Sequence, residues 1–133
     1  MDIQETAVFA AKIQSFDNRN FDAANIAAWQ ELLAQYTLRD CVKAVSQHFS
    51  KSVAWIMPAH VIELVREMEA ARRNTFHNGV YPTQADEQSG HWLEASRRLN
   101  RAVATGSLSP AAYQRYHDQN LTLDSVLGLV VIQ

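Results

Sequence analysis

The regular spacing of large apolar residues constrains this chain more than any other feature. Through most of its length these residues recur at intervals of three and four, which places them on one face of an α-helix. The alternation typical of a β-strand is almost absent before the last residues. The pattern therefore predicts an all-α protein, a small bundle of about four helices followed by a linker and a second helical segment.

Capping residues divide the first half of the chain into separate predicted helices. Asp22 and Thr37 are expected to be N-caps, because their side-chain oxygens can accept from the free N–H groups of a first turn. Pro58 suits the first position of a further helix that runs to about Arg73. The residues expected to face the core of this bundle are Phe9, Ile13, Phe16, Ile26, Trp29, Leu32, Leu33, Tyr36, Leu38, Cys41, Val42, Val45, Phe49, Val61, Leu64, Val65 and Met68.

Two segments between the predicted helices differ from each other in character. Residues 52–57 are too apolar for a solvated loop, so they are expected to cross the core with Trp55 or Ile56 inside. Residues 74–91 instead collect turn-forming residues, with two glycines and a proline around an Asn-Gly pair. The second segment is therefore predicted to be a linker between two subregions.

These signals predict an N-terminal helical bundle over residues 1–74, a linker over 75–91, and a C-terminal helical segment with an apolar tail over 84–133. The C-terminal segment either packs on the bundle as one domain or stands apart from it. Thr83 is expected to cap one helix that ends at Gly106. Ser109-Pro110 is expected to open a shorter one.

Charge and targeting signals limit where this protein acts. Twelve basic and fourteen acidic residues leave a formal charge of -2, so the molecule as a whole does not attract nucleic acid or anionic lipid, and DNA contact requires a local patch. The N-terminus lacks the basic and apolar regions of a signal peptide, and no segment has the roughly 20 apolar residues of a membrane span. A single Cys41 fits a reducing compartment. A cytoplasmic location without membrane contact is therefore predicted.

No set of residues in the sequence predicts an active site. Phosphate-cradling glycine loops, nucleophile elbows and Cys-x-x-Cys pairs are all missing from it. The histidines lack the close pairing of a metal site on one helix; they are His48, His60, His77, His91 and His117. We therefore expect no catalytic residues, no metal and no cofactor, and a protein that is not an enzyme.

Arginines form the strongest candidate contact surface. Arg97, Arg98 and Arg101 are expected to project from one side of the helix before Gly106, with Glu94 as the nearby acid. Such a face can bind an acidic partner or phosphates, or it can be an ordinary solvated face with an Arg–Glu pair.

Two further arginines end the helix that Pro58 opens. Arg72 and Arg73 suit the negative end of that helix dipole, and Glu69 is expected to pair with either of them. A phosphate site is expected if the two helices bring both arginine clusters together.

The apolar tail is the second candidate contact surface. Its members are Leu127, Leu129, Val130, Val131 and Ile132. The tail either folds back over a groove of the bundle or stays exposed and pairs with another chain, which includes a second copy of this one.

The packing residues of the first half resemble those of the small helical helicase-loader and replisome-organiser proteins of bacteriophages. The resemblance covers about residues 9–73 and rests on the Trp29-Gln-Glu-Leu-Leu33 stripe, Ala44-Val45, Met57-Pro-Ala-His-Val61 and Arg66. It implies a non-enzymatic adaptor that binds the replicative helicase and helps deliver it to origin DNA or to an initiator. In that family a flexible C-terminal part binds the helicase, whereas residues 84–118 of this chain are predicted to form ordered helices.

The leading functional hypothesis is therefore a phage or prophage DNA-replication accessory protein whose partner is a replicative helicase. A helix-turn-helix DNA-binding regulator is the first alternative, with the helix after Thr37 in the major groove. Its exposed side is expected to carry Arg39, Asp40, Lys43, Ser46 and Gln47, of which two are cationic. A helical protein that binds and inhibits another host target is the remaining alternative.

Overall fold

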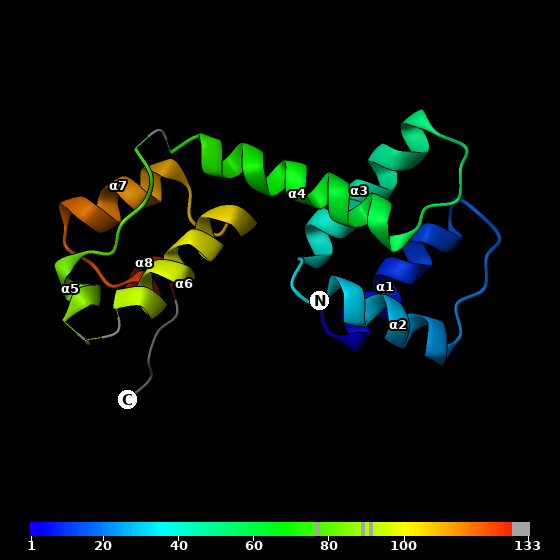
Figure 1. Cartoon of the computed structure of the whole chain (residues 1–133), viewed down its shortest axis with the longest axis horizontal. Coiled ribbons are helices and arrows are strands. Elements are labelled where there is room, and N and C mark those ends of the chain that lie inside the picture. Colours follow the sequence, from blue (N-terminus) through cyan, green and yellow to red (C-terminus); the bar gives the residue numbers. More distant parts are fainter. Residues whose placement is uncertain (77, 89, 91, 129–133) are drawn as a thin grey trace. The chain divides into compact units, whose positions relative to one another are not determined.

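The computed structural model describes residues 1–76, 78–88, 90 and 92–128, and it is helical without strands over that part of the chain. This confirms the predicted all-α fold class. In chain order (Figure 1) the helices are α1 Ile3–Gln14, α2 Ala23–Leu33, α3 Leu38–Lys51, α4 Pro58–Asn74, α5 Gln84–Glu87, α6 Trp92–Thr105, α7 Pro110–Asp118 and α8 Leu123–Val126.

The chain divides into two compact units, Met1–Met68 and Glu69–Gln133, so the division falls inside α4. The sequence places the end of the first region at residue 74 and a linker after it. In the structure the described residues from 75 onward belong to the second unit, and Val80 is buried in the core of that unit. Each unit has its own hydrophobic core.

The core of the first unit is built from one apolar face each of α1, α2, α3 and the first turns of α4. Phe9, Ile13, Leu33, Val45 and Val61 are fully buried there. The aromatic residues pack on one another at its centre, with the Trp29 ring 5.7 Å from Phe9 and 5.6 Å from Phe21. The periodic stripes therefore do form one core, as the helical spacing predicts.

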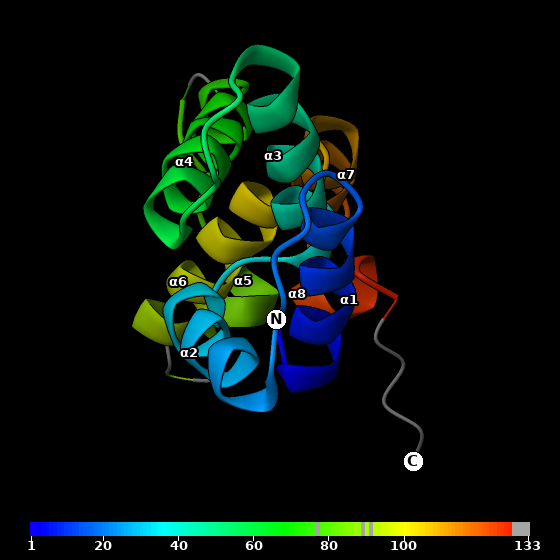
Figure 2. The ribbon, with the colours of Figure 1, turned by 90° about the vertical axis from the view of Figure 1, so that its right-hand side faces the viewer.

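Polar groups set the ends of these helices. The Asp22 carboxylate accepts from the Asn25 N–H at 2.8 Å, which confirms the predicted N-cap of α2. Thr37 caps α3 in the same way. At the other end of α2 the amino group of Met1 donates to the carbonyls of Ala34 and Tyr36, at 2.9 and 2.7 Å. Both views place the N-terminus beside α1 and α2 (Figures 1 and 2).

Two residues of the first unit, Phe16 and Leu32, depart from the expected core. Phe16 lies beyond the end of α1 and is 48% exposed, because the helix that would turn it inward has already ended. Leu32 is 54% exposed, since its neighbour Leu33 occupies the inward position of α2. Of the two residues expected to anchor segment 52–57, Ile56 is fully buried, whereas Trp55 is 62% exposed.

The second unit contains two helices where one was predicted to start at Thr83. Thr83 does cap a helix, but α5 ends at Glu87 and α6 begins at Trp92. Gly90 between them has a φ of +75°, a left-handed conformation that interrupts a helix. Trp92 is consequently at the start of α6 and 49% exposed, while the later residues Leu99 and Val103 are buried.

Tyr116 is the largest fully buried side chain of the second unit, and its hydroxyl organises the segment around α5. The hydroxyl donates to the Asp86 carboxylate and accepts from the Thr83 N–H at 3.0 Å. Asp86 also accepts from the Leu123 N–H at 3.1 Å, and the Thr83 hydroxyl donates to the Leu121 carbonyl at 2.7 Å. Burial and the bond to Asp86 raise the pKa of Tyr116 to about 12.

This pKa shift predicts a loss of stability in alkali. The Tyr116 phenol is neutral below its ordinary pKa of 10, so the stabilisation is complete there and is lost as the pH rises from about 10 to about 12. The free energy of unfolding should fall by up to about 3 kcal/mol across that window. Urea unfolding followed by far-UV circular dichroism measures the fall, and Tyr116→Phe should show a smaller one. Equal falls in the two proteins would contradict the assignment.

Candidate functional site

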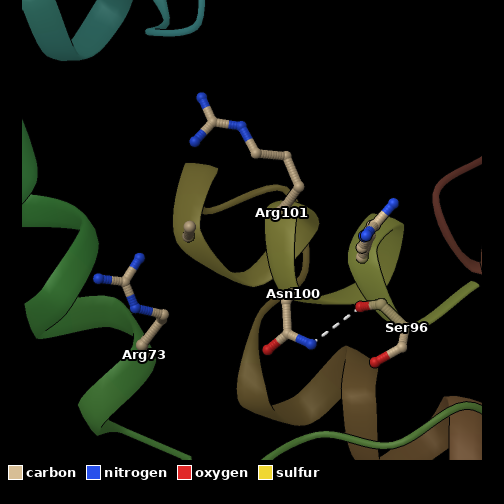
Figure 3. Close-up of a pocket in the computed structure, with 6 residues that line it drawn as sticks. Arg73, Ser96, Asn100 and Arg101 are labelled. Carbon is tan, nitrogen blue, oxygen red and sulfur yellow. Dashed lines mark hydrogen bonds between the residues drawn. The ribbon is translucent and has the colours of Figure 1, made fainter. Parts of the chain in front are cut away.

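Three of the five arginines singled out in the sequence line one surface groove of the second unit. The groove has a volume of about 320 Å³ and is lined by Arg73, Ser96, Arg97, Asn100, Arg101 and Ala104. Figure 3 shows Arg73 on α4 and the other labelled residues on α6, on opposite sides of it. The sequence predicted a phosphate site if two helices brought both arginine clusters together. These three residues meet that condition.

One arginine of the groove, Arg101, has a side chain that is 43% exposed and pairs with a buried carboxylate. The Arg101 Nη1 donates to both oxygens of Glu69, at 2.9 and 3.3 Å, and Glu69 is only 6% exposed. The sequence offered Arg72 or Arg73 as the partner of Glu69, whereas the structure shows Glu69 paired with Arg101 of α6. Glu69 lies 32 residues before Arg101, a separation at which sequence spacing on one helix carries no information.

Two other arginines have structural partners as well. Arg72 donates to the carbonyl of Ala104 at 3.0 Å, and that carbonyl lies in the last turn of α6, where carbonyls lack helical partners. Arg98 pairs with Asp124 at the start of α8, and this hydrogen bond raises the pKa of Arg98. Glu94 also acts on Arg98 through its charge, as expected, but the ion-pair partners of Arg98 and Arg101 come from distant parts of the chain.

The remaining arginines give the groove its charge. Arg73 and Arg97 are exposed, and within the described residues neither forms an ion pair or a side-chain hydrogen bond. Of the three arginines that line the groove, Arg101 is paired with Glu69, which leaves the positive charges of Arg73 and Arg97 without an ion pair in the described residues. Asn100 is held by its bond to the Ser96 carbonyl at 2.8 Å (Figure 3). Such an arrangement can bind an oxyanion, because a guanidinium donates in pairs to oxygens.

An exposed apolar loop is the most prominent surface feature of the first unit. It connects α3 to α4, and in it Val53 is 101% exposed, Trp55 62% and Met57 50%. Isolated apolar residues on a surface are ordinary, but three within five positions form a patch of the kind that marks contact sites. The sequence offered Trp55 or Ile56 as the core anchor and did not predict that Trp55 would be part of an exposed patch.

Arg19 holds this loop in place. Its Nη1 donates to the Ile56 carbonyl at 2.7 Å, its Nη2 donates to Asp17 at 3.0 Å, and its side chain is 8% exposed. The guanidinium carbon also lies 4.5 Å from the centre of the Trp55 ring. Arg19 falls in the break between two predicted helices, where the sequence gave no signal that it would be buried.

Two histidines support the same loop from the flanking helices. The His48 Nε2 is 2.7 Å from the Ala54 carbonyl oxygen, and the Met57 N–H donates to the His60 Nδ1 at 2.8 Å. Their rings lie 4.9 Å apart, although the sequence shows no close histidine pairing on one helix, because the two residues come from different helices. The described part of the chain has no cluster of three or more residues that could hold a metal ion.

Only the first residue of the predicted tail lies in the described part of the chain. Leu127 is half-buried and packs against the core of the second unit. Leu129, Val130, Val131 and Ile132 lie outside the described residues. Within the described residues, no helix combines the length and the apolar character that a membrane span requires.

No protein-family model, curated protein or solved structure matches this chain. The arginine groove and the apolar loop are therefore the features that bear on its function.

The buried Glu69 predicts that Arg101 matters for stability and Arg97 does not. Arg101→Ala leaves a buried carboxylate without its cation, which should lower the free energy of unfolding by about 2 kcal/mol. Arg97→Ala removes an exposed side chain and should change it by less than about 0.5 kcal/mol. Urea unfolding of the two variants measures the difference, and equal losses would show that the ion pair contributes nothing.

The contacts of Arg19 predict that this residue stabilises the first unit, whereas an exposed cation of the same unit does not. Arg19→Leu removes the donors to Ile56 and Asp17 and should cost about 2 kcal/mol of unfolding free energy. Lys51→Leu, a matched charge removal at an exposed position of α3, should change it by less than about 0.5 kcal/mol. Thermal or urea unfolding checks this, and a neutral Arg19→Leu would mean that the loop holds its place without this residue.

Proposed function

We propose that this protein is a non-enzymatic adaptor, a phage or prophage DNA-replication accessory protein that binds a replicative helicase through the apolar loop of its first unit. The observation that carries the proposal is the exposed set of Val53, Trp55 and Met57 on a loop that is held in one conformation. Tryptophan and arginine are the residues in which binding energy most often concentrates at protein interfaces. Trp55 with Arg19 beneath it has that composition.

Preorganisation of the loop supports the same proposal. The flanking contacts of Arg19, His48 and His60 are made within the free protein, so binding does not have to order this segment. A surface whose side chains are already positioned loses less conformational entropy on association. Three exposed apolar residues that have no role in the core are then available to a partner.

The helicase as partner rests on the family resemblance. The residues that carry the resemblance belong to the first unit, where Trp29, Leu33, Val45 and Val61 are in the core and Met57 is in the apolar loop itself. The family's flexible C-terminal region has no counterpart in the described part of this chain, because residues 92–126 form α6, α7 and α8. We therefore assign the contact to the first unit.

One observation favours a second function, a helix-turn-helix-type regulator of DNA. Asp40 was expected on the exposed side of α3, but it is buried, which removes an acid from the face that would enter the major groove. Arg39 and Lys43 are exposed on α3, and residues 34–37 form the short turn from α2. A regulator of this kind would lose duplex affinity on Lys43→Glu and retain it on Trp55→Ala.

The adaptor proposal predicts that Trp55→Ala weakens binding to the purified phage or host replicative helicase by about 30-fold or more, or about 2 kcal/mol. Isothermal titration calorimetry with the full chain measures this affinity. Leu32→Ala is the matched control, because Leu32 is also a large exposed apolar residue of the first unit but lies on α2. The control should bind as the unaltered chain does.

Two results would contradict the proposal in different ways. If the unaltered chain does not bind the helicase at moderate salt, the helicase is not its partner. Binding that Trp55→Ala and Leu32→Ala weaken equally would remove the loop as the contact surface.

A further inference from the structure

We propose that the arginine groove of the second unit binds the phosphates of a nucleic-acid strand. This inference goes beyond the adaptor function and does not rest on it, since it concerns a different unit and a different kind of ligand. The groove is the one lined by Arg73, Arg97 and Arg101 together with Ser96 and Asn100.

Charge is the first argument. Arg73 and Arg97 line the same groove, and within the described residues neither forms an ion pair, so two positive charges there have no carboxylate at salt-bridge distance. A bound anion supplies such a partner. The protein as a whole carries a formal charge of -2, so this local excess runs against the sign of the whole molecule.

The structural contacts of the other arginines show which arginines of the groove remain for a ligand. Arg101 is bound to Glu69, Arg98 to Asp124 and Arg72 to the end of α6. The contacts of Arg101 and Arg72 join α4 to α6, the helices that form the groove, whereas the side chains of Arg73 and Arg97 form no ion pair or hydrogen bond within the described part of the chain. The two residues that remain for a ligand are thus the ones that come from opposite sides of the groove.

The polar residues on α6 fit a strand better than a single ion. Ser96 and Asn100, and likewise Arg97 and Arg101, are four residues apart, so each pair extends about 6 Å along the helix. That length is close to the spacing of successive phosphates on a nucleic-acid strand. The Ser96 hydroxyl has no partner within the described residues and supplies a neutral donor of the kind that contacts phosphate oxygens.

The same lining favours phosphates over stacked bases. Its members are three arginines, a serine, an asparagine and an alanine, and none of them offers an aromatic ring on which a base can stack. Binding should therefore depend mainly on the phosphates, with an affinity that falls as salt rises.

Fluorescence anisotropy with the full chain and a labelled single-stranded oligothymidylate of about 16 nucleotides tests the proposal. Between about 50 mM and about 200 mM salt, the double variant Arg73→Gln/Arg97→Gln should bind about tenfold more weakly, with a log–log salt slope shallower by about 1.4. Arg115→Gln is the control for Arg97→Gln, since Arg115 is an exposed arginine of α7 outside the groove. It should bind as the unaltered chain does.

Two further measurements identify which phosphates bind and where they bind. A 5′-phosphorylated and an unphosphorylated strand should bind equally well if internal phosphates occupy the groove, and the phosphorylated strand should bind more tightly if the terminal phosphate does. Titration of the unaltered chain followed by NMR should shift the amide signals of residues 96–101 and leave those of α7 in place. This measurement does not depend on how the variants fold.

Three outcomes would overturn the proposal. The first is that the unaltered chain binds no strand even at low salt. The second is that Arg97→Gln and Arg115→Gln weaken binding equally, which would reduce the effect to overall charge. The third is that an oligoglutamate peptide binds in the groove and the oligothymidylate does not, which would assign the groove to an acidic protein segment. None of these results depends on the helicase measurement with Trp55→Ala.

Discussion

The second unit depends on the ion pair between Glu69 and Arg101. A carboxylate that is 6% exposed requires a cation, because an unpaired buried charge is among the most costly groups in a protein. Arg101 supplies that cation. Three residues after Glu69 on α4, Arg72 donates to the carbonyl of Ala104, which lies three residues after Arg101 on α6. The two contacts hold the last turns of α4 against α6. The groove between these helices, with Arg73 at its edge, follows from them.

Burial and hydrogen bonding separate arginines that stabilise the fold from arginines that are available to a ligand. In the first unit the Arg19 side chain is nearly buried, and its Nη1 and Nη2 donate to Ile56 and Asp17, which makes it part of the fold. In the second unit Arg73 and Arg97 are exposed without such contacts in the described residues. Residue type alone does not distinguish the two groups, whereas burial and hydrogen bonding do.

The two proposed contact surfaces differ in their chemistry. The loop around Trp55 is apolar and is held by polar contacts, which suits a protein surface that excludes water. The groove around Arg97 is cationic and lacks aromatic residues, which suits phosphates. Each surface belongs to a unit with its own hydrophobic core, so a substitution in one surface leaves the core that supports the other intact.

The sequence by itself determined the fold class and most of the helix ends, because these depend on local interactions. Apolar periodicity, the caps at Asp22 and Thr37 and the left-handed Gly106 all act within a few residues of the chain. The tertiary structure alone decided which charges pair and which apolar residues remain exposed. Glu69 meets Arg101 across 32 residues, and Trp55 is turned outward by the burial of Ile56 beside it. Such outcomes depend on distant segments that local spacing does not describe.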